Sequence, residues 1–416
     1  MPRLFAAVVV LLALAVPPVA AQTLELERVV LLSRHGVRAP SETNAELDRQ
    51  VASPFPVWPV PPGDLTPRGA ELMRFMGSFY RVIYSGLGLI SPERCPRPGI
   101  VASWADVDQR TRASAQALLE GLYPQCKIEA RHQADLAQPD PLFHPTIGIC
   151  PLDEAQARSA ILKRVGGSMQ TQLDMYAPQY ARLQDVLCPA GIASANAQCG
   201  YKGLPTRFVV RDGRVGIDGP VRMASSMTKI FELEATQGMP PAQVAWGRLR
   251  DFGELRDLMF LHKLEFDLTQ RTDYIARRSG SAMLSAILDG LQRTDDRRLT
   301  LLVGHDTNIA NVAGLLDIHW VIPGFTPDDA SPGGALAFEL LHERPGGARY
   351  VRVVYYAQTL DQMRAQTQFS FADLAARAEI NVPGCGGEGP ANLCPLPRFL
   401  EIASAKIDRA CVPPGK

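Results

Sequence analysis

The sequence predicts an α/β fold in which a mostly parallel central sheet is flanked by helices and interrupted by an inserted, mainly α-helical domain. Three continuous apolar runs, Leu26–Ser33, Ile100–Ala105 and Leu299–Val303, are typical of strands buried on both faces. Helical patterns separate these runs, as in a parallel sheet with crossover helices. Residues 139–262 differ from this alternation of strands and helices, because they are mostly helical in pattern and interrupted by Gly and Pro.

The N-terminal residues 1–21 are predicted to be a signal peptide. Arg3 provides a short positive region, Leu4–Val16 an apolar core, and Val19–Ala21 a small-residue cleavage site, so the mature chain would start at Gln22. The alternative is a membrane anchor. The short apolar run and the prolines that follow it argue against an anchor. No later segment is long and apolar enough to span a membrane, so we expect a periplasmic or secreted protein.

After the first strand, residues 53–62 form a proline-rich loop, because proline removes the backbone donors that regular structure needs. Thr66-Pro67 has the pattern of an N-cap followed by proline at the first helical position. An apolar face then predicts a helix to about Ser85. A further helix is expected from about Thr111 to Leu122, after the second strand.

Residues 208–217 read as a β-hairpin inside the insertion, with Asp212-Gly213 as its turn. Ala335–Leu341 and Tyr350–Tyr356 read as late strands. The predicted domains are therefore an α/β catalytic domain made of residues 22–138 and 263–416, and an inserted helix-rich domain made of residues 139–262.

The composition excludes several classes of partner. The 416 residues are 46% hydrophobic and 21% charged, and 43 Lys and Arg balance 43 Asp and Glu, giving a net charge of +0. No overall field attracts the protein to nucleic acid or to anionic membranes. Any site for an anion must therefore be local.

Three of the predicted strands are followed by segments rich in charged and titratable side chains, Arg34–Arg38, Asp106–Arg110 and His305-Asp306. The carboxyl ends of strands in an open α/β sheet meet at one edge, where ligands bind. The set would bring together two histidines, three arginines and a carboxylic acid. Guanidinium groups suit phosphate oxygens, and a neutral imidazole can attack phosphorus. No metal-binding motif or Gly-x-x-x-x-Gly-Lys loop is present, so we expect phosphoryl transfer without a metal or cofactor.

Each of these residues also has a structural alternative. The first segment could be a charged surface turn, and Asp306 could simply cap the helix that follows it. Arg110 could pair with Asp106 or Asp108 at the surface, and Asp106 could orient an arginine. The remaining histidines read as ordinary solvated or packing residues; these are His132, His144, His319 and His342.

The segments Arg34–Pro40 and Gly304–Asn308 together resemble the histidine acid phosphatases, most closely the bacterial periplasmic phytase and acid phosphatase group. Other segments that match this family are Ala105–Arg112, Pro139–Phe143, Gln237–Pro240, Gln270–Thr272 and Ser331–Gly334. The resemblance covers most of the mature chain and implies a phosphoglycerate mutase-like fold.

The resemblance assigns a role to each residue of the set. His35 would be the nucleophile that forms a phosphohistidine. Phosphate binding would fall to Arg34, Arg38, Arg110 and His305. Asp306 would be the general acid that protonates the leaving group, which favours acid pH.

The resemblance also places residues around the substrate. Ser225, His262 and Thr307 match family positions that contact substrate, and Ser41 is a mild change from threonine. Glu42 stands where the phytases have lysine, and Lys229 stands where glutamate is usual. We hypothesise a charge swap across the pocket mouth, the alternative being two unrelated surface changes. Two further substrate-side candidates are Asp106 and Arg278.

The 8 cysteines suggest disulfides, because their number is even and the chain is predicted to be exported. Spacing alone suggests local links for Cys188 with Cys199 and for Cys385 with Cys394. The resemblance implies these two pairs and also Cys95–Cys126 and Cys150–Cys411.

We therefore expect an exported phosphomonoesterase that acts on phytate and other small phosphomonoesters as a monomer. A glucose-1-phosphatase or sugar phosphatase of the same family is the nearest alternative. A phosphoglycerate mutase-like transferase is disfavoured by the signal peptide and the insertion. A periplasmic anion-binding protein is the alternative from another class, and it would need the arginines but not Asp306.

Overall fold

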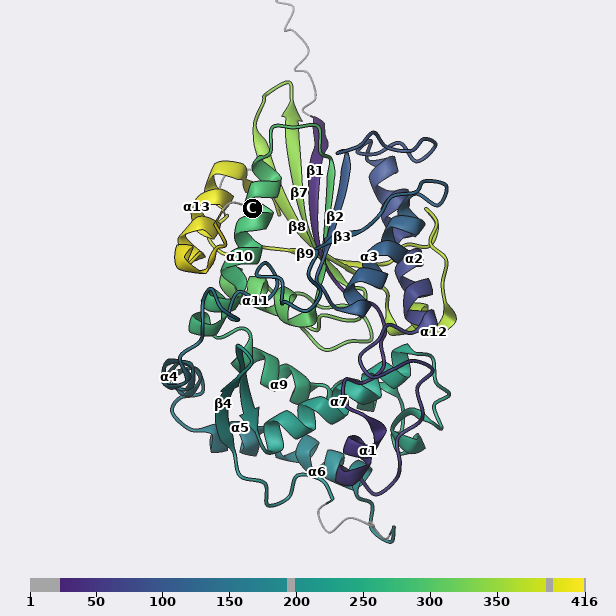
Figure 1. Cartoon of the computed structure of the whole chain (residues 1–416), viewed down its shortest axis with the longest axis vertical. Coiled ribbons are helices and arrows are strands. Elements are labelled where there is room, and N and C mark those ends of the chain that lie inside the picture. Colours follow the sequence, from purple (N-terminus) through teal and green to yellow (C-terminus); the bar gives the residue numbers. More distant parts are fainter. Residues whose placement is uncertain (1–22, 193–198, 387–391, 415–416) are drawn as a thin grey trace, which may run out of the picture.

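The computed structural model describes residues 23–192, 199–386 and 392–414 (Figure 1). The signal peptide predicted over residues 1–21 lies outside these ranges. Figure 1 shows a layered part built on a sheet, with a mainly helical part packed below it. Among the described residues, no helix is long and apolar enough to cross a membrane.

The central sheet contains β1 (Thr23–Arg34), β2 (Val101–Ala105), β3 (Arg131–His132), β6 (Leu299–Gly304), β7 (Ala335–Arg344), β8 (Arg349–Ala357), β9 (Ala376–Ile380) and β10 (Cys394–Pro395). The order is β10-β8-β7-β1-β6-β2-β3, with β9 also paired to β8. The pairs β1–β6, β6–β2 and β2–β3 are parallel, and the others are antiparallel. The strands β1, β2, β3, β6 and β8 therefore share one direction, which confirms a mostly parallel sheet.

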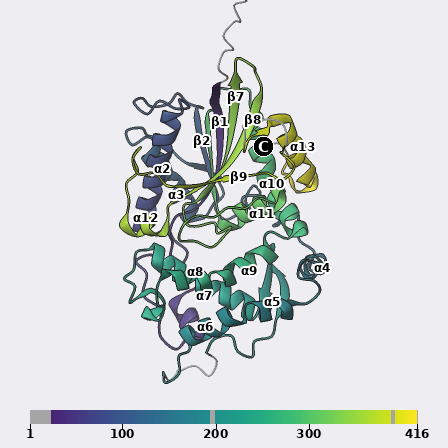
Figure 2. The same cartoon turned by 180° about the vertical axis from the view of Figure 1, so that it is seen from behind.

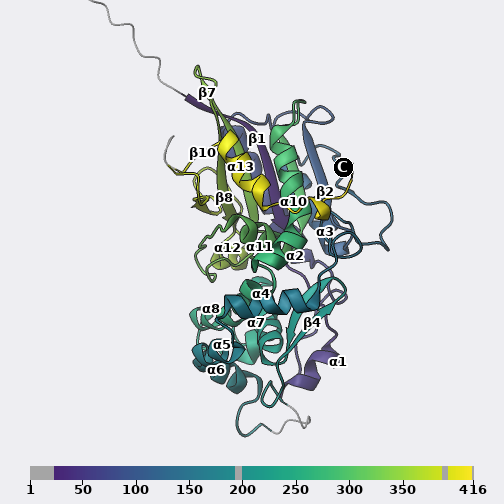
Figure 3. The ribbon, with the colours of Figure 1, turned by 90° about the vertical axis from the view of Figure 1, so that its left-hand side faces the viewer.

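Helices cover both faces of this sheet (Figures 2 and 3). On one face lie α2 (Pro67–Gly86) and α3 (Gln109–Leu122), and on the other α10 (Asp273–Gln292), α11 (Asp306–Leu316) and α13 (Leu396–Lys406). Successive residues of β1 serve the two faces, because Val29 packs with the first layer and Val30 with the second. The predicted start of α2 is confirmed, since Thr66 accepts a hydrogen bond from the Gly69 amide.

The helical part contains α4 (Glu154–Arg164), α5 (Met169–Met175), α6 (Ala177–Leu187), α7 (Pro220–Thr236), α8 (Phe252–Leu258) and α9 (Phe260–Thr269). The short elements are α1 (Asn44–Leu47), α12 (Leu360–Ala365) and the 3-10 turns η1 (Asp48–Gln50), η2 (Val244–Gly247) and η3 (Arg409–Cys411). The predicted hairpin is confirmed as β4 (Arg207–Arg211) and β5 (Arg214–Asp218). Its turn residues Asp212 and Gly213 have φ of 49° and 69°, as the tight hairpin turn requires.

The boundary predicted at residue 262 falls within α9, which packs against α7 of the helical part. The loop before α2 also joins the helical part, because the ring of Phe55 lies 4.7 Å from Trp246 and 6.3 Å from Phe231. We therefore propose that the helical region ends after α9 and includes α1 and the loop that follows it.

The four disulfides implied by the family resemblance are all formed: Cys95–Cys126, Cys150–Cys411, Cys188–Cys199 and Cys385–Cys394. The long-range pair, Cys150–Cys411, links the segment before α4 to the C-terminal η3 turn. The prediction of structural rather than metal-binding cysteines is confirmed.

Candidate active site

The carboxyl ends of β1, β2 and β6 carry the three segments that the sequence singled out. Arg34 is the last residue of β1, and the amide of His35 donates to the Gly304 carbonyl at the end of β6 (2.9 Å). Gly36 follows at a point where α2 crosses closely, since a Cβ there would lie 2.8 Å from the Gly69 carbonyl oxygen. Glycine is therefore required between the histidine and the second arginine.

His35 is buried and held as a neutral imidazole. Burial, with the positive charges of Arg110 and Arg34, lowers its pKa well below the ordinary value. Nδ1 lies 2.8 Å from the Gly36 carbonyl oxygen, which can only accept, so Nδ1 carries the proton. The other nitrogen, Nε2, therefore keeps its lone pair, which is the state a nucleophile needs.

Three arginines surround this imidazole with unused donors. Arg34 is fully buried, and its Nη1 donates to the Ala330 carbonyl (2.6 Å). Burial, with Arg110 and Arg34 nearby, lowers the pKa of Arg38 to about 10. Within the described part of the chain, the Nε atoms of Arg34, Arg38 and Arg110 are buried without a hydrogen-bond partner. Buried donors left unpaired indicate a site that an anion completes.

Asp306 faces Arg34 rather than serving only as a cap. His305 is the N-cap of α11, and Asp306 is the first helical residue. One oxygen of Asp306 accepts from the Thr307 amide (2.9 Å), and the other pairs with Arg34 Nη2 (2.9 Å). Burial raises the pKa of Asp306, but the charges of Arg34 and Lys229 outweigh burial and hold it well below the ordinary value.

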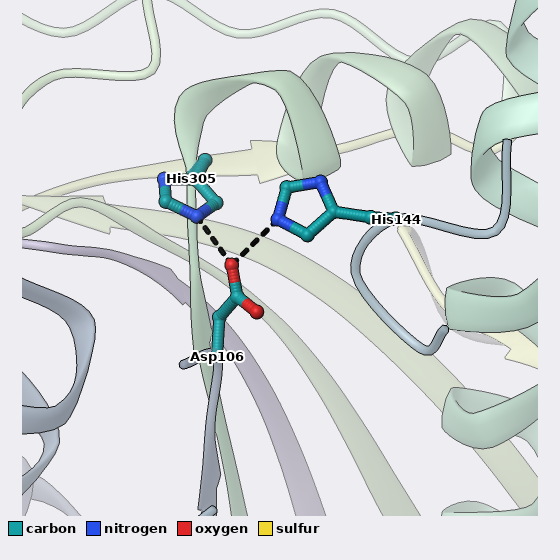
Figure 4. A group of neighbouring side chains, drawn as sticks. All are labelled: Asp106, His144 and His305. Carbon is teal, nitrogen blue, oxygen red and sulfur yellow. Dashed lines mark hydrogen bonds and ion pairs between the residues drawn. The ribbon is translucent and has the colours of Figure 1, made fainter. Parts of the chain in front are cut away.

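Asp106 holds two imidazoles instead of an arginine (Figure 4). Its Oδ2 lies 2.6 Å from His305 Nε2 and 2.7 Å from His144 Nε2, and its side chain is fully buried. Burial raises its pKa, yet the bonds from His144 and His305 outweigh burial and lower it. Asp106 therefore makes its direct contacts with imidazoles and not with an arginine. The expectation that it contacts substrate stays a prediction.

Arg110 combines the two interpretations made from the sequence. Its Nη2 pairs with Asp108 (2.6 Å), as the surface alternative supposed. The side chain is nevertheless only 19% exposed, and the same nitrogen lies 3.5 Å from His305 Nδ1. Arg110 therefore borders the site while Asp108 fixes it.

The structure brings together Ser225 and His262, whose Oγ and Nδ1 lie 2.8 Å apart. Burial, with the charge of Lys229, lowers the pKa of His262 to about 3. His262 and Asp306 line one small cavity. Thr307 is adjacent to Asp306, whereas Ser41 and Glu42 are exposed on the loop after β1.

Two of the predicted substrate residues have partners other than those expected. Lys229 is buried, and its Nζ pairs with Glu232 and lies 3.6 Å from Asp329 Oδ1. Its charge also acts on Asp306 and His262. Because Lys229 is buried, the alternative of two surface changes is wrong, whereas the charge swap stays a prediction.

Arg278, unlike Lys229, lies away from the site. Arg278 lies on α10, where its guanidinium donates to the Pro151 carbonyl (2.7 Å) and pairs with Asp408 (3.5 Å). These contacts hold α10 against the two segments that the Cys150–Cys411 disulfide joins.

The contact of His144 with Asp106 was not predicted, because the sequence suggested an ordinary solvated or packing histidine. Its neighbours Pro139–Phe143 already matched the family, and that position directly beside a matching segment was the available signal. A hydrogen bond from the Asn308 side chain to the Phe143 carbonyl (2.8 Å) fixes the loop that carries His144 beside α11.

Comparison with known proteins identifies the family of this chain. Residues 25–356 match the model of the histidine phosphatase superfamily (branch 2). Phytase AppA of Escherichia coli is 35% identical over 406 residues, covering 93% of each chain. A glucose-1-phosphatase of Salmonella typhimurium is 28% identical, covering 91% of this chain and 92% of its own.

Among solved structures, a Hafnia alvei phytase in complex with tartrate superposes with a TM-score of 0.88 at 37% identity. The match covers 94% of this chain and 99% of the Hafnia chain.

Proposed function

The chain belongs to branch 2 of the histidine phosphatase superfamily, and from that premise we propose that it hydrolyses phosphomonoesters, phytate foremost, through a phosphohistidine at His35. The observation that carries the proposal is the neutral, buried His35 beside three arginines with unused donors. A phosphoryl group would satisfy those donors and present its phosphorus to Nε2 of His35.

In the first step, Nε2 of His35 forms a bond to phosphorus while the ester P–O bond breaks. Arg34, Arg38 and Arg110 stabilise the charge that gathers on the phosphoryl oxygens. Asp306 gives its proton to the leaving oxygen. In the second step, Asp306 accepts a proton from the water that attacks the phosphohistidine, which releases phosphate and restores His35.

Asp306 has to be protonated before the first step, although Arg34 and Lys229 favour its carboxylate form. A bound phosphoryl dianion offsets the charge of Arg34 and raises the pKa of Asp306. Acid pH supplies the proton. Hydrolysis at acid pH therefore follows from the charges around Asp306.

His305 serves the phosphoryl group through its second nitrogen. Asp106 engages Nε2 and thereby sets the ring so that Nδ1 faces Arg110. When both ring nitrogens are protonated, Nδ1–H can donate to a phosphoryl oxygen while Asp106 balances the imidazolium charge.

Phytate is favoured over glucose 1-phosphate because AppA and the Hafnia enzyme are named as phytases and exceed the glucose-1-phosphatase in identity. The paired Ser225 and His262 support a substrate site beside Asp306. Glucose-1-phosphatase activity remains the second candidate, supported by the relative from Salmonella. The interpretation as an anion-binding protein does not account for Asp306 beside His305.

We also propose that the chain is exported after removal of residues 1–21 and acts as a monomer on small phosphate esters, without a metal or organic cofactor. Four disulfides support an oxidising compartment.

The test is a substrate panel at acid pH on the mature, disulfide-bonded chain, comparing phytate, glucose 1-phosphate and a chromogenic aryl phosphate in EDTA. We expect phytate to give the highest kcat/KM. His35→Ala should lower turnover by at least about 10³-fold, and denaturing quench with labelled substrate should trap acid-labile phosphate on the wild type only.

His342→Ala is the matched control, since His342 lies in β7 and outside the site. Undiminished turnover in a folded His35→Ala variant would contradict the mechanism. A higher kcat/KM for glucose 1-phosphate than for phytate would favour the second candidate.

A further inference from the structure

Asp106, His144 and His305 bring together two imidazole nitrogens and one carboxylate oxygen (Figure 4). The three donor atoms lie within 4.8 Å of one another. They come from three segments, the end of β2, the loop after residue 140 and the start of α11. The mechanism above uses His305 and its partner Asp106, but it gives His144 no task.

The backbone fixes all three donors before any ligand arrives. Asp106 donates its amide to the Val303 carbonyl (3.0 Å), and His144 donates its amide to the Asp140 carbonyl (2.9 Å). The amide of His305 donates to the Asn308 side chain (2.9 Å), and the same side chain holds the His144 loop at Phe143. A site with so little freedom loses little conformational entropy when it binds.

These donors have the composition of a divalent metal site. Imidazole nitrogen with carboxylate oxygen suits borderline cations such as Zn²⁺ and Co²⁺. A second group of potential donors, Cys150, Asp408 and Cys411, has its sulfurs joined in a disulfide and unavailable as thiolates. Of the two groups found in the described residues, the histidine group therefore is the one able to bind a cation.

We propose that Asp106, His144 and His305 form a binding site for a Zn²⁺-class cation, which inhibits the enzyme by displacing His305 from the position that Asp106 sets. Binding replaces the Nε2 proton of each imidazole, and both protons pass to solvent. The present N···O separations of 2.6 and 2.7 Å must open. Tetrahedral bonds of about 2.0 to 2.1 Å need roughly 3.3 Å between ligand atoms, so each of these two separations has to widen by less than about 1 Å.

The neighbouring charges permit a cation here despite the arginines. Asp108 Oδ2 lies 3.4 Å from His305 Nε2, and it adds a second carboxylate to that of Asp106. Three protein ligands leave a fourth position for water or inorganic phosphate. The binding claim stands without the proposed function, whereas the inhibition rests on it.

The experiment titrates the metal-free mature chain with Co²⁺ and follows visible absorption, with calorimetric competition by Zn²⁺. We expect one saturable equivalent in the wild type. His144→Asn should lower the affinity by at least about tenfold, as removal of a ligand does at minimum. X-ray absorption of the Zn²⁺ form should report two imidazole ligands, and this measurement needs no variant.

The matched control is His319→Asn. His319 also faces two carboxylates, Asp328 at 2.8 Å and Asp317 at 3.6 Å, but no second imidazole. We expect this variant to bind Co²⁺ like the wild type. Wild-type affinity in His144→Asn, no saturable binding in the wild type, or a Zn²⁺ spectrum without two imidazoles would each overturn the site.

Inhibition is measured separately, with Zn²⁺ added to the chromogenic assay and each variant compared with its own metal-free rate. We expect His144→Asn to need at least about tenfold more Zn²⁺ for half inhibition. If the protein binds metal but hydrolyses no ester in the absence of metal, the proposed function is contradicted and the metal site is not. If it hydrolyses esters but binds no metal, the metal site is contradicted and the proposed function is not.

Discussion

The buried carboxylates at the strand ends have lowered pKa values, whereas those on α7 and α9 of the helical region have raised ones. Asp106 and Asp306 have pKa values below the ordinary range because histidine and arginine partners outweigh burial. Burial instead raises the pKa of Glu232 and Glu234 to about 8 and that of Glu265 to about 7. The same residue chemistry therefore has opposite protonation in the two regions.

The cause lies in the partners that each region supplies. Among the residues that the structure describes, the hydrogen-bond donor to Glu234 is the backbone amide of Ala245 (2.8 Å). Glu232 has Lys229 beside it, but the nearby carboxylate of Asp329 joins burial in raising its pKa. We infer that the strand ends are built to hold charge for chemistry, while the helical region is most stable with its glutamates protonated. Only the second condition favours acid pH, because a carboxylate with a lowered pKa loses its contribution to stability as pH falls.

The largest expected effect tests the strand-end half of this comparison. Asp306→Asn keeps the size of the side chain but cannot supply a proton. We expect kcat on an alkyl phosphate to fall by about 10² to 10⁴-fold. The loss on an aryl phosphate should be much smaller, because that leaving group needs no proton. Steady-state kinetics on both esters measure the difference.

Asp317→Asn is the control for this prediction. It makes the same chemical change at the other end of α11, in a left-handed position that asparagine tolerates. Equal losses of kcat on the two esters would exclude Asp306 as the general acid.

A smaller effect tests the link between the two regions, Lys229. This helical-region lysine lowers the pKa of Asp306. Lys229→Met should therefore raise that pKa, and Asp306 would stay protonated to higher pH. We expect the alkaline limb of kcat to move upward by roughly one pH unit, as measured by a pH profile on an alkyl phosphate.

Lys263→Met is the matched control, because Lys263 also pairs with two carboxylates, Asp267 and Asp328. We expect its pH profile to follow the wild type. A downward shift for Lys229→Met, or equal upward shifts in both variants, would show that Lys229 does not act on Asp306 by its charge.

The sequence predicts a feature well when the interacting residues are close together in the chain or repeat in a regular pattern. The runs that became β1, β2 and β6 were predictable because burial on both faces leaves a continuous apolar pattern. The start of α2 was predictable because a cap is local. Family motifs then located His35 and Asp306.

What the sequence could not predict depends on contacts between distant segments. The partner of His144 lies 38 residues away at Asp106, and one of the two partners of Lys229 lies 100 residues away at Asp329. No local pattern marks such pairs. Arg278 was misassigned because Arg277-Arg278 offered no local feature to show which segment α10 would contact.

The smallest expected effect tests the helical half of the comparison. The pKa of Glu234 is about 8 in the folded chain, against an ordinary 4.5. The folded state therefore holds an extra proton between these values. The associated stability is complete below about pH 4.5 and is lost as pH rises through about 8, by up to about 1.4 kcal/mol per pH unit for this group. Denaturant unfolding across this range should show the decline.

Glu234→Gln removes the ionisation and keeps an oxygen for the Ala245 amide, so its stability should fall less steeply between pH 5 and 8 than that of the wild type. Glu401→Gln is the control, because Glu401 is exposed and pairs with Arg398 on α13. A wild-type slope in Glu234→Gln would mean that the buried glutamate is ionised in the folded chain. The two regions would then differ in their partners but not in their protonation.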